Sequence, residues 1–213
     1  MTQPLRALAL RAGVAGPVLY FGTQVLVGAV TPGYSFRGQP ASDLGAGDGL
    51  AASFFNAGAI LTGLAVIAGA VGLVSVSRRL PSHRVLTWPM AVAMISTGAA
   101  AVAAGVFPLP DSRHGGGPVG AGMFAVPLIA SLVLWQWTST GLRAYAIGNL
   151  VGFVASGAAL SGSTPLDEVA NAGALQRLLA LTVFGAIGVI CWVARRTADQ
   201  GGRSRTARSS LHC

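Results

Sequence analysis

Five polar side chains stand out as candidates for chemistry in a sequence that is otherwise strongly apolar. Asp43 and Asp111 are carboxylates in segments between long apolar runs, and His114 follows Asp111 by three residues. Asn56 lies about two helical turns inside an apolar run, and Arg177 opens the last one. An amide or a charge within such a run is costly unless it has a partner or faces water. We therefore predict that these five residues converge on one polar, ligand-binding pocket.

The pair of Asp111 and His114 has two interpretations. The carboxylate could orient the imidazole as a general base, or His114 could be a solvated loop residue. A metal site is not expected, because catalytic zinc usually takes three protein ligands and His114 is the only histidine on its side of the bundle. His83 lies among arginines on the opposite side, and His212 lies in the C-terminal tail.

Two glycine-rich strings resemble ligand-binding motifs but lack their context. Residues 114–117 read HGGG, as in the oxyanion hole of some esterases, yet the sequence has no G-x-S-x-G elbow. Residues 45–49 read GAGDG, but the third glycine is misplaced for a dinucleotide fingerprint and no strand precedes it. The chain also contains no lysine, which excludes a P-loop lysine and a lysine Schiff base. We expect no cofactor and favour a non-enzymatic protein.

The composition indicates the surroundings of these residues. The chain has 213 residues, of which 53% are hydrophobic and only 9% charged, and its mean hydropathy is +0.64. A soluble domain carries about 25% charged residues, so a lipid bilayer is the expected solvent. Helical runs of about 18 or more apolar residues can cross a hydrocarbon core of roughly 30 Å. We predict an all-α integral membrane bundle of six transmembrane helices, at residues 13–30, 50–76, 85–107, 120–137, 144–160 and 174–193.

The arginines predict the orientation of this bundle. If the N-terminus is cytoplasmic, the outer segments hold only Arg37, Arg113 and Arg177 of the fourteen basic residues. The inner segments hold the others: Arg6, Arg11, Arg78, Arg79, Arg84, Arg143, Arg195, Arg196, Arg203, Arg205 and Arg208. This is the bias of the positive-inside rule. We predict a multi-pass plasma-membrane protein with both termini in the cytoplasm.

The two ends of the chain need separate treatment. The first apolar run follows two arginines, as in a signal peptide, but it exceeds the usual length of about 7–15 residues and no A-x-A cleavage site follows. Residues 196–213 have too little apolar content to fold alone. We predict a six-helix domain over residues 1–195 and a basic, disordered cytoplasmic tail over residues 196–213, held near anionic lipid. Nucleic acid is an alternative partner for the tail, but we expect none.

Small residues predict how the helices pack. Membrane helices associate through small residues that let two backbones approach closely, because lipid supplies no hydrophobic driving force. The chain has 30 glycines, and spacings of four or seven residues join three pairs: Gly148 with Gly152, Ala65 with Gly69, and Gly98 with Gly105. We expect them to pack helices within one bundle rather than to form a dimer interface.

Short motifs in the outer segments resemble those of a known family. They are Gly33-Tyr34-Ser35, Ala41-Ser42-Asp43-Leu44-Gly45, Phe54-Phe55-Asn56, Gly63-Leu64, Gly105-Val106-Phe107-Pro108 with Asp111 and His114, and Gly173 with Gln176-Arg177-Leu178. Over residues 14–195 the chain resembles the membrane family called domain of unknown function 998. That family is similar in its six-helix layout to the Frag/DRAM/Sfk group, whose members are associated with membrane-lipid handling. The resemblance therefore implies lipid as a partner.

The sequence is compatible with three functions. The leading hypothesis is an outward-facing pocket that binds a lipid head group or a small polar ligand, with Arg177 pairing an anionic group while Asp43 and Asp111 accept hydrogen bonds. The second is a small transporter or transporter subunit, which would want polar groups near the bilayer midplane. The third is a membrane-embedded hydrolase or transferase that uses Asp111 and His114.

Overall fold

The computed structural model describes residues 1–80 and 83–209, and in that part of the chain all regular structure is helical. The long helices are α1 (Gln3–Val30), α2 (Leu50–Val76), α3 (His83–Val106), α4 (Gly122–Trp135), α5 (Thr140–Leu160) and α6 (Ala172–Ser209). Three short 3-10 helices lie between them: η1 (Ala41–Gly45), η2 (Ser77–Arg79) and η3 (His114–Ala121). The predicted all-α class is confirmed.

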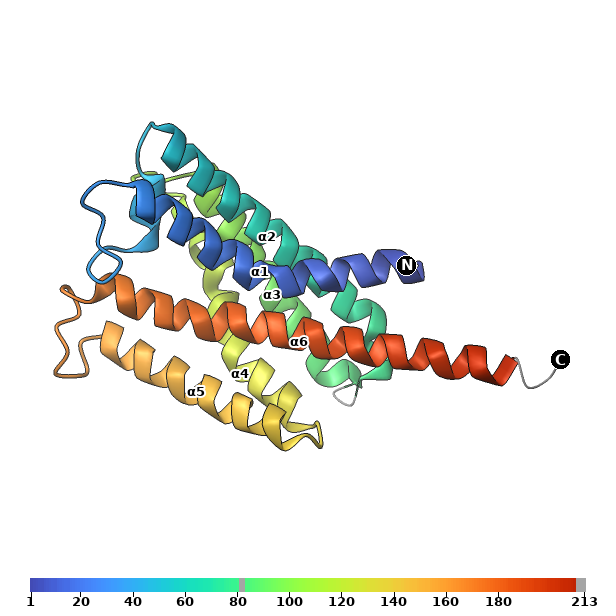
Figure 1. Ribbon diagram of the computed structural model, residues 1–213. Helices are drawn as coiled ribbons and strands as arrows, with labels where there is room; N and C mark the ends of the chain where they lie inside the picture. Colours follow the sequence, from blue (N-terminus) through green and yellow to red (C-terminus); the bar gives the residue numbers. More distant parts are fainter. Residues whose placement is uncertain (81–82, 210–213) are drawn as a thin grey trace.

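The long helices run up and down in one bundle (Figure 1). The segments that join α1 to α2, α3 to α4 and α5 to α6 lie at one end, which we call the η1 end. The N-terminus, the α2–α3 and α4–α5 connections and the last turns of α6 lie at the opposite end, which we call the tail end. The chain therefore brings its three longest connections together at one face of the bundle.

Five helical segments are long and apolar enough to cross a membrane. They are Gln3–Val30, Leu50–Arg79, Val85–Val106, His114–Trp135 and Ala172–Asp199. The sixth predicted span corresponds to α5, which has 21 residues and is therefore about 31 Å long. Arg143 and Asn149 lower its hydropathy, and α5 lies outside the group of five for that reason.

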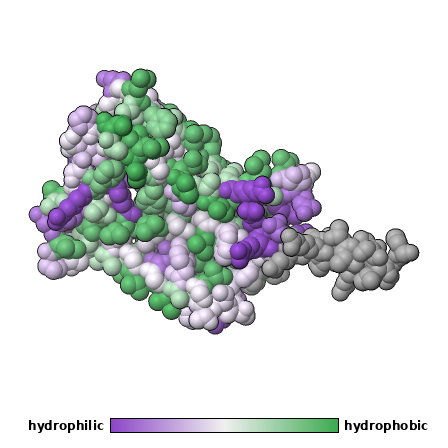
Figure 2. Space-filling view, in the orientation of Figure 1, coloured by the Kyte–Doolittle hydropathy of each residue, from purple (hydrophilic) through white to green (hydrophobic). Residues whose placement is uncertain are grey.

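The surface is apolar over much of its area between the two ends. Figure 2 shows hydrophobic residues over the middle of the bundle and most of the hydrophilic residues toward its ends. Large aliphatic side chains on several helices are more than half exposed, among them Val18, Leu61, Val92 and Val151. Such exposure would be unfavourable in water over so large an area and is ordinary against lipid.

Glycines make the closest helix contacts, as predicted. A Cβ atom at Gly98 of α3 would lie 2.7 Å from the carbonyl oxygen of Gly63 in α2, and one at Gly63 would overlap the carbonyl oxygen of Gly98. Gly105 meets the backbone of α2 in the same way. A Cβ atom at Gly69 would lie 2.8 Å from Cα of Gly13, so α1 and α2 also touch through their backbones.

The third pair of small residues behaves differently. A Cβ atom at Gly148 would meet no atom within 4 Å, and one at Gly152 would lie 3.3 Å from Cγ2 of Thr182. Both glycines line an open groove between α5 and α6. At Gly152 the two helices approach closely, as predicted, whereas at Gly148 α5 stands off from α6 and the predicted packing is wrong.

The C-terminal segment continues the last helix. The backbone of α6 continues as a helix to Ser209, past the predicted domain boundary at residue 195. Side-chain contacts support the helix across that boundary, since Arg195 and Asp199 approach within 3.8 Å at a spacing of four residues. Arginine and alanine, which are frequent here, are good helix formers. His212 and Cys213 lie outside the described residues.

Candidate functional site

Arg177 holds the loop of residues 31–40 against α6 at the η1 end. Its Nη1 atom donates to three carbonyl oxygens, those of Phe36 at 2.8 Å, Gly173 at 2.9 Å and Gln39 at 3.1 Å. Its Nη2 atom donates to the hydroxyl of Tyr34. A planar guanidinium suits this task because its donors point in fixed directions. One side chain of the last helix thus fixes the course of the first loop.

Aromatic rings complete the surroundings of this guanidinium. The carbon Cζ of Arg177 lies 5.1 Å from the ring centroid of Phe36 and 5.7 Å from that of Tyr34. The two rings pack edge to face with their centroids 5.2 Å apart, and the Tyr34 hydroxyl donates to the carbonyl oxygen of Pro40 at 3.0 Å. Gly173 has to be glycine here, because a Cβ atom would overlap the carbonyl oxygen of Gln39.

The charge of Arg177 has no counter-ion in the described part of the chain. The ion pairs found there join Arg113 to Asp111 and Arg195 to Asp199. The Nε atom of Arg177 is buried without a hydrogen-bond partner. Buried or half-buried charges are normally paired, because desolvation penalises an isolated one. Arg177 is therefore a partly buried cation, and the groups that bond to it are neutral.

Two further hydrogen bonds tie the loop to α6 and to the residue that precedes it. The Oε1 atom of Gln176 accepts from the backbone N–H of Ala41 at 2.7 Å. The Nε atom of Arg37 donates to Oδ1 of Asn171, also at 2.7 Å. Sequence reasoning from depth and charge missed Gln176, and its place beside Arg177 in the family-like motif was the signal that could have found it.

Asn56 of α2 fixes the next part of the same segment, which is η1. Its Nδ2 atom donates to the carbonyl oxygen of Gly45, the last residue of η1, at 3.1 Å. Gly45 is required at this contact because a Cβ atom would overlap the Asn56 amide. Asp43, two residues earlier, is exposed, and its carboxylate makes no hydrogen bond or ion pair within the described residues. Asn56 thus has a positioning role, while Asp43 is free to meet a ligand.

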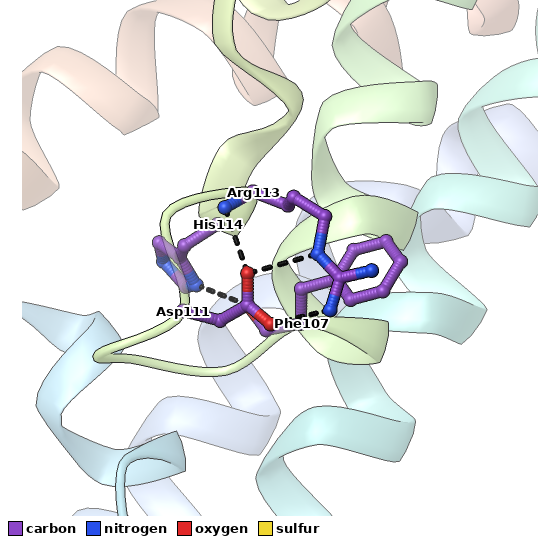
Figure 3. A network of polar contacts seen from close by, with 4 residues as sticks. All are labelled: Phe107, Asp111, Arg113 and His114. Carbon is purple, nitrogen blue, oxygen red and sulfur yellow. Dashed lines mark hydrogen bonds and ion pairs between the residues drawn. The ribbon is translucent and has the colours of Figure 1, made fainter.

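Asp111 lies in a separate cluster with Arg113 and Phe107 (Figure 3). Its Oδ1 atom accepts from the backbone N–H of Arg113 at 2.9 Å and from Nε at 3.0 Å, and its Oδ2 atom accepts from Nη2 at 2.7 Å. The guanidinium lies 3.8 Å from the ring centroid of Phe107. The hydrogen bonds from Arg113 lower the pKa of Asp111 to about 2. The carboxylate is therefore ionised at neutral pH and is not a proton donor there.

His114 pairs with a backbone carbonyl oxygen rather than with this carboxylate. Its Nδ1 atom lies 2.9 Å from the carbonyl oxygen of Phe107, an acceptor that requires the proton to be on Nδ1. The Nε2 atom is then the acceptor of the neutral ring. Of the two interpretations of this pair, the one in which Asp111 orients the imidazole does not match this geometry, because Arg113 offers two charge-assisted hydrogen bonds to the same carboxylate. An acid–base pair of Asp111 and His114 is not assembled in this structure.

A family comparison matches this chain over most of its length. The model of the family described as Protein of unknown function (DUF998) covers residues 14–193. The chain belongs to the DUF998 family. The resemblance seen in the outer motifs is thereby confirmed. No curated protein and no solved structure matches the chain.

In this DUF998 protein the five predicted site residues fall into two groups. Arg177 and Asn56 fix residues 34–45, which also carry Asp43, from two sides. Asp111 and His114 bond within the connection between α3 and η3. A common pocket formed by all five stays a prediction. Within the described residues, no three His, Cys, Asp or Glu side chains lie close enough together to hold a metal ion.

Proposed function

We propose that this protein is a plasma-membrane protein with six transmembrane helices and cytoplasmic termini, and that its outer end binds a negatively charged lipid head group or small polar ligand. The η1 end is then extracytoplasmic and the tail end cytoplasmic. The distribution of arginine supports this orientation, since eleven of the fourteen belong to segments at the tail end.

The course of the chain supports α5 as the sixth span. Helix α4 ends at the tail end, and α6 begins at the η1 end (Figure 1). The chain has to return between them, and α5 is the element that does so. Its length of about 31 Å matches a hydrocarbon core of roughly 30 Å. Its polar Asn149 and the hydroxyl of Tyr145 lie 3.5 Å apart and satisfy each other in part.

The uncompensated charge of Arg177 carries the binding proposal. The guanidinium is only partly buried, lies at the η1 end and has no acidic partner in the described part of the chain. An anion that reached it would gain a charge-assisted hydrogen bond in a site of reduced dielectric constant. The exposed carboxylate of Asp43 and the Nε2 atom of His114 are polar groups available at the same end for the uncharged part of a ligand.

Binding of a soluble head-group analogue tests this proposal. Full-length protein in phosphatidylcholine nanodiscs would be titrated with glycerol 3-phosphate by calorimetry. We expect Arg177→Gln to lose binding at least tenfold and Arg177→Lys to retain part of it. The matched control is Arg37→Gln, which removes an equal charge from the same surface and should keep the wild-type affinity. Equal affinities for Arg177→Gln and Arg37→Gln would remove Arg177 from the site.

A further inference from the structure

The seam between α5 and α6 is hollowed along most of its length. A groove of about 650 Å³ lies there, with Gly148 and Gly152 of α5 facing Thr182 and Gly185 of α6. Its α5 wall extends from Tyr145 to Ala159, which corresponds to about 21 Å of helix. The walls are mostly aliphatic side chains and glycine backbone. The groove is therefore long, narrow and apolar, and it lies between the two ends of the bundle.

A second cavity continues this seam toward the tail end. It measures about 370 Å³, and its lining includes Trp137, Ser139, Trp192 and Arg196. Leu142 in this cavity lies one helical turn before Tyr145 of the groove, and on α6 Trp192 lies one turn after Val189. The two cavities thus follow one another along the same pair of helices.

The cavity at the tail end is basic. The guanidinium of Arg196 lies 4.1 Å above the ring of Trp192 and has no carboxylate partner among the described residues. The first turn of α5 borders the same space, with Ser139 as its N-cap. The N-terminus of a 21-residue helix presents free backbone N–H groups and a partial positive charge. Arg143 fixes the α4–α5 turn by donating to the carbonyl oxygens of Trp135 at 3.3 Å and Trp137 at 3.0 Å.

We propose that the α5/α6 seam binds one anionic phospholipid. Its phosphate lies between Arg196 and the first turn of α5, the two tryptophans flank the glycerol region, and one acyl chain occupies the groove. This end reaches the cytoplasmic leaflet in the orientation proposed above, and the outer site at Arg177 plays no part.

The shape and charge of the seam select this occupant. The groove volume divided by its length of about 21 Å gives a cross-section of about 30 Å². A helix about 10 Å across has a cross-section of about 80 Å², so a second copy of the chain does not fit into the groove. An acyl chain fits, and the unpaired cation at one end distinguishes an anionic head group from a zwitterionic one.

Lipid retention in native mass spectrometry tests the assignment. Full-length protein would be released from nanodiscs of equal parts phosphatidylglycerol and phosphatidylcholine. We expect one phosphatidylglycerol per chain to be retained, and Arg196→Gln to lower that retention about fivefold. The matched control is Arg78→Gln, because Arg78 is an exposed arginine at the same end that does not line the seam. Equal losses for both variants, equal retention of the two lipids or a dimer that retains no lipid would overturn the proposal.

A second variant tests the acyl-chain groove independently. A Cβ atom at Gly148 meets nothing within 4 Å, so Gly148→Leu fills the groove without a clash at its first carbon. We expect this variant to keep the helical circular-dichroism spectrum and to lose the retained lipid. A folded Gly148→Leu protein that retains phosphatidylglycerol as well as the wild type would contradict the proposal. Arg177→Gln should leave this retention unchanged, which separates the two sites.

Discussion

The guanidinium of Arg177 and the carbonyl oxygen of Phe36 are separated by 141 residues in the sequence and by 2.8 Å in the structure. This hydrogen bond connects the first loop to the last span. Together with the bonds to Gln39 and Tyr34, it makes residues 34–40 part of the bundle rather than a free loop.

Removing the hydrogen bonds of Arg177 should make residues 34–40 more mobile. Arg177→Ala deletes several charge-assisted hydrogen bonds, each worth about 1.5–3 kcal/mol when a charged group takes part. We expect faster hydrogen–deuterium exchange over residues 34–41 and a lower melting temperature. Arg37→Ala removes one exposed hydrogen bond and should change both quantities less. Unchanged exchange in Arg177→Ala would show that the loop is held by other contacts.

The close contact of α2 and α3 predicts that alanine substitution changes the melting temperature differently at two glycines. At Gly98 a methyl group would press on the carbonyl oxygen of Gly63, so Gly98→Ala should lower the melting temperature. At Gly148 there is open space, so Gly148→Ala should leave the melting temperature unchanged or raise it, since alanine is about 0.5–1 kcal/mol better than glycine within a helix. Thermal unfolding in detergent measures both, and equal effects would contradict the packing described.

The low pKa of Asp111 predicts that the stability of its loop depends on pH. The folded-state pKa of about 2 lies below the ordinary value of about 3.9. The stabilisation that comes with this difference is therefore complete above about pH 4 and is lost as the pH falls toward 2. We expect protease sensitivity at residues 111–114 to rise over that interval. Asp111→Asn should be sensitive at every pH, whereas Asp48→Asn, which removes an exposed carboxylate, should keep the wild-type profile.

The buried amide of Gln24 predicts that an apolar side chain at this position makes the protein more stable. Its side chain is 1% exposed, and its amide makes no hydrogen bond of good geometry, although the hydroxyl of Tyr20 is a polar group close to it. The adjoining cavity of about 20 Å³ has room for one water molecule at most. Because an unsatisfied buried polar group costs about 1–3 kcal/mol, Gln24→Met should raise the melting temperature. A marked fall would show that the amide makes a favourable interaction, for example with a bound water.

The positions of the helices could be predicted from the sequence, because a long apolar run has few alternatives to a helix in a bilayer. The run at residues 50–76 coincides with α2. By contrast, α1 begins ten residues before its predicted run, at Gln3 rather than at residue 13. The hydrocarbon thickness limits only the apolar part of a helix. The helix itself can continue beyond that part, because the Leu, Ala and Arg residues before residue 13 are good helix formers.

The place of Arg177 in the fold could be predicted from the sequence, but its hydrogen-bond partners could not. The position of Arg177 at the start of the last span follows from hydropathy, yet its acceptors are backbone carbonyl oxygens, which carry no sequence signal. By spacing alone Asp111 could have met His114, three residues on, but Arg113 offers a planar guanidinium and a backbone N–H two residues away. Local turn geometry decides between such neighbours, and spacing alone does not.

Both proposed binding sites depend on the bundle having its η1 end outside the cell. Cysteine labelling of intact cells with a membrane-impermeant maleimide tests this directly, in a background of Cys191→Ala and Cys213→Ser. Asp43→Cys should be labelled from outside, and Arg79→Cys only after the cells are opened; both native side chains are exposed in the structure. Labelling of Arg79→Cys in intact cells, with Asp43→Cys protected, would reverse the orientation and contradict the account.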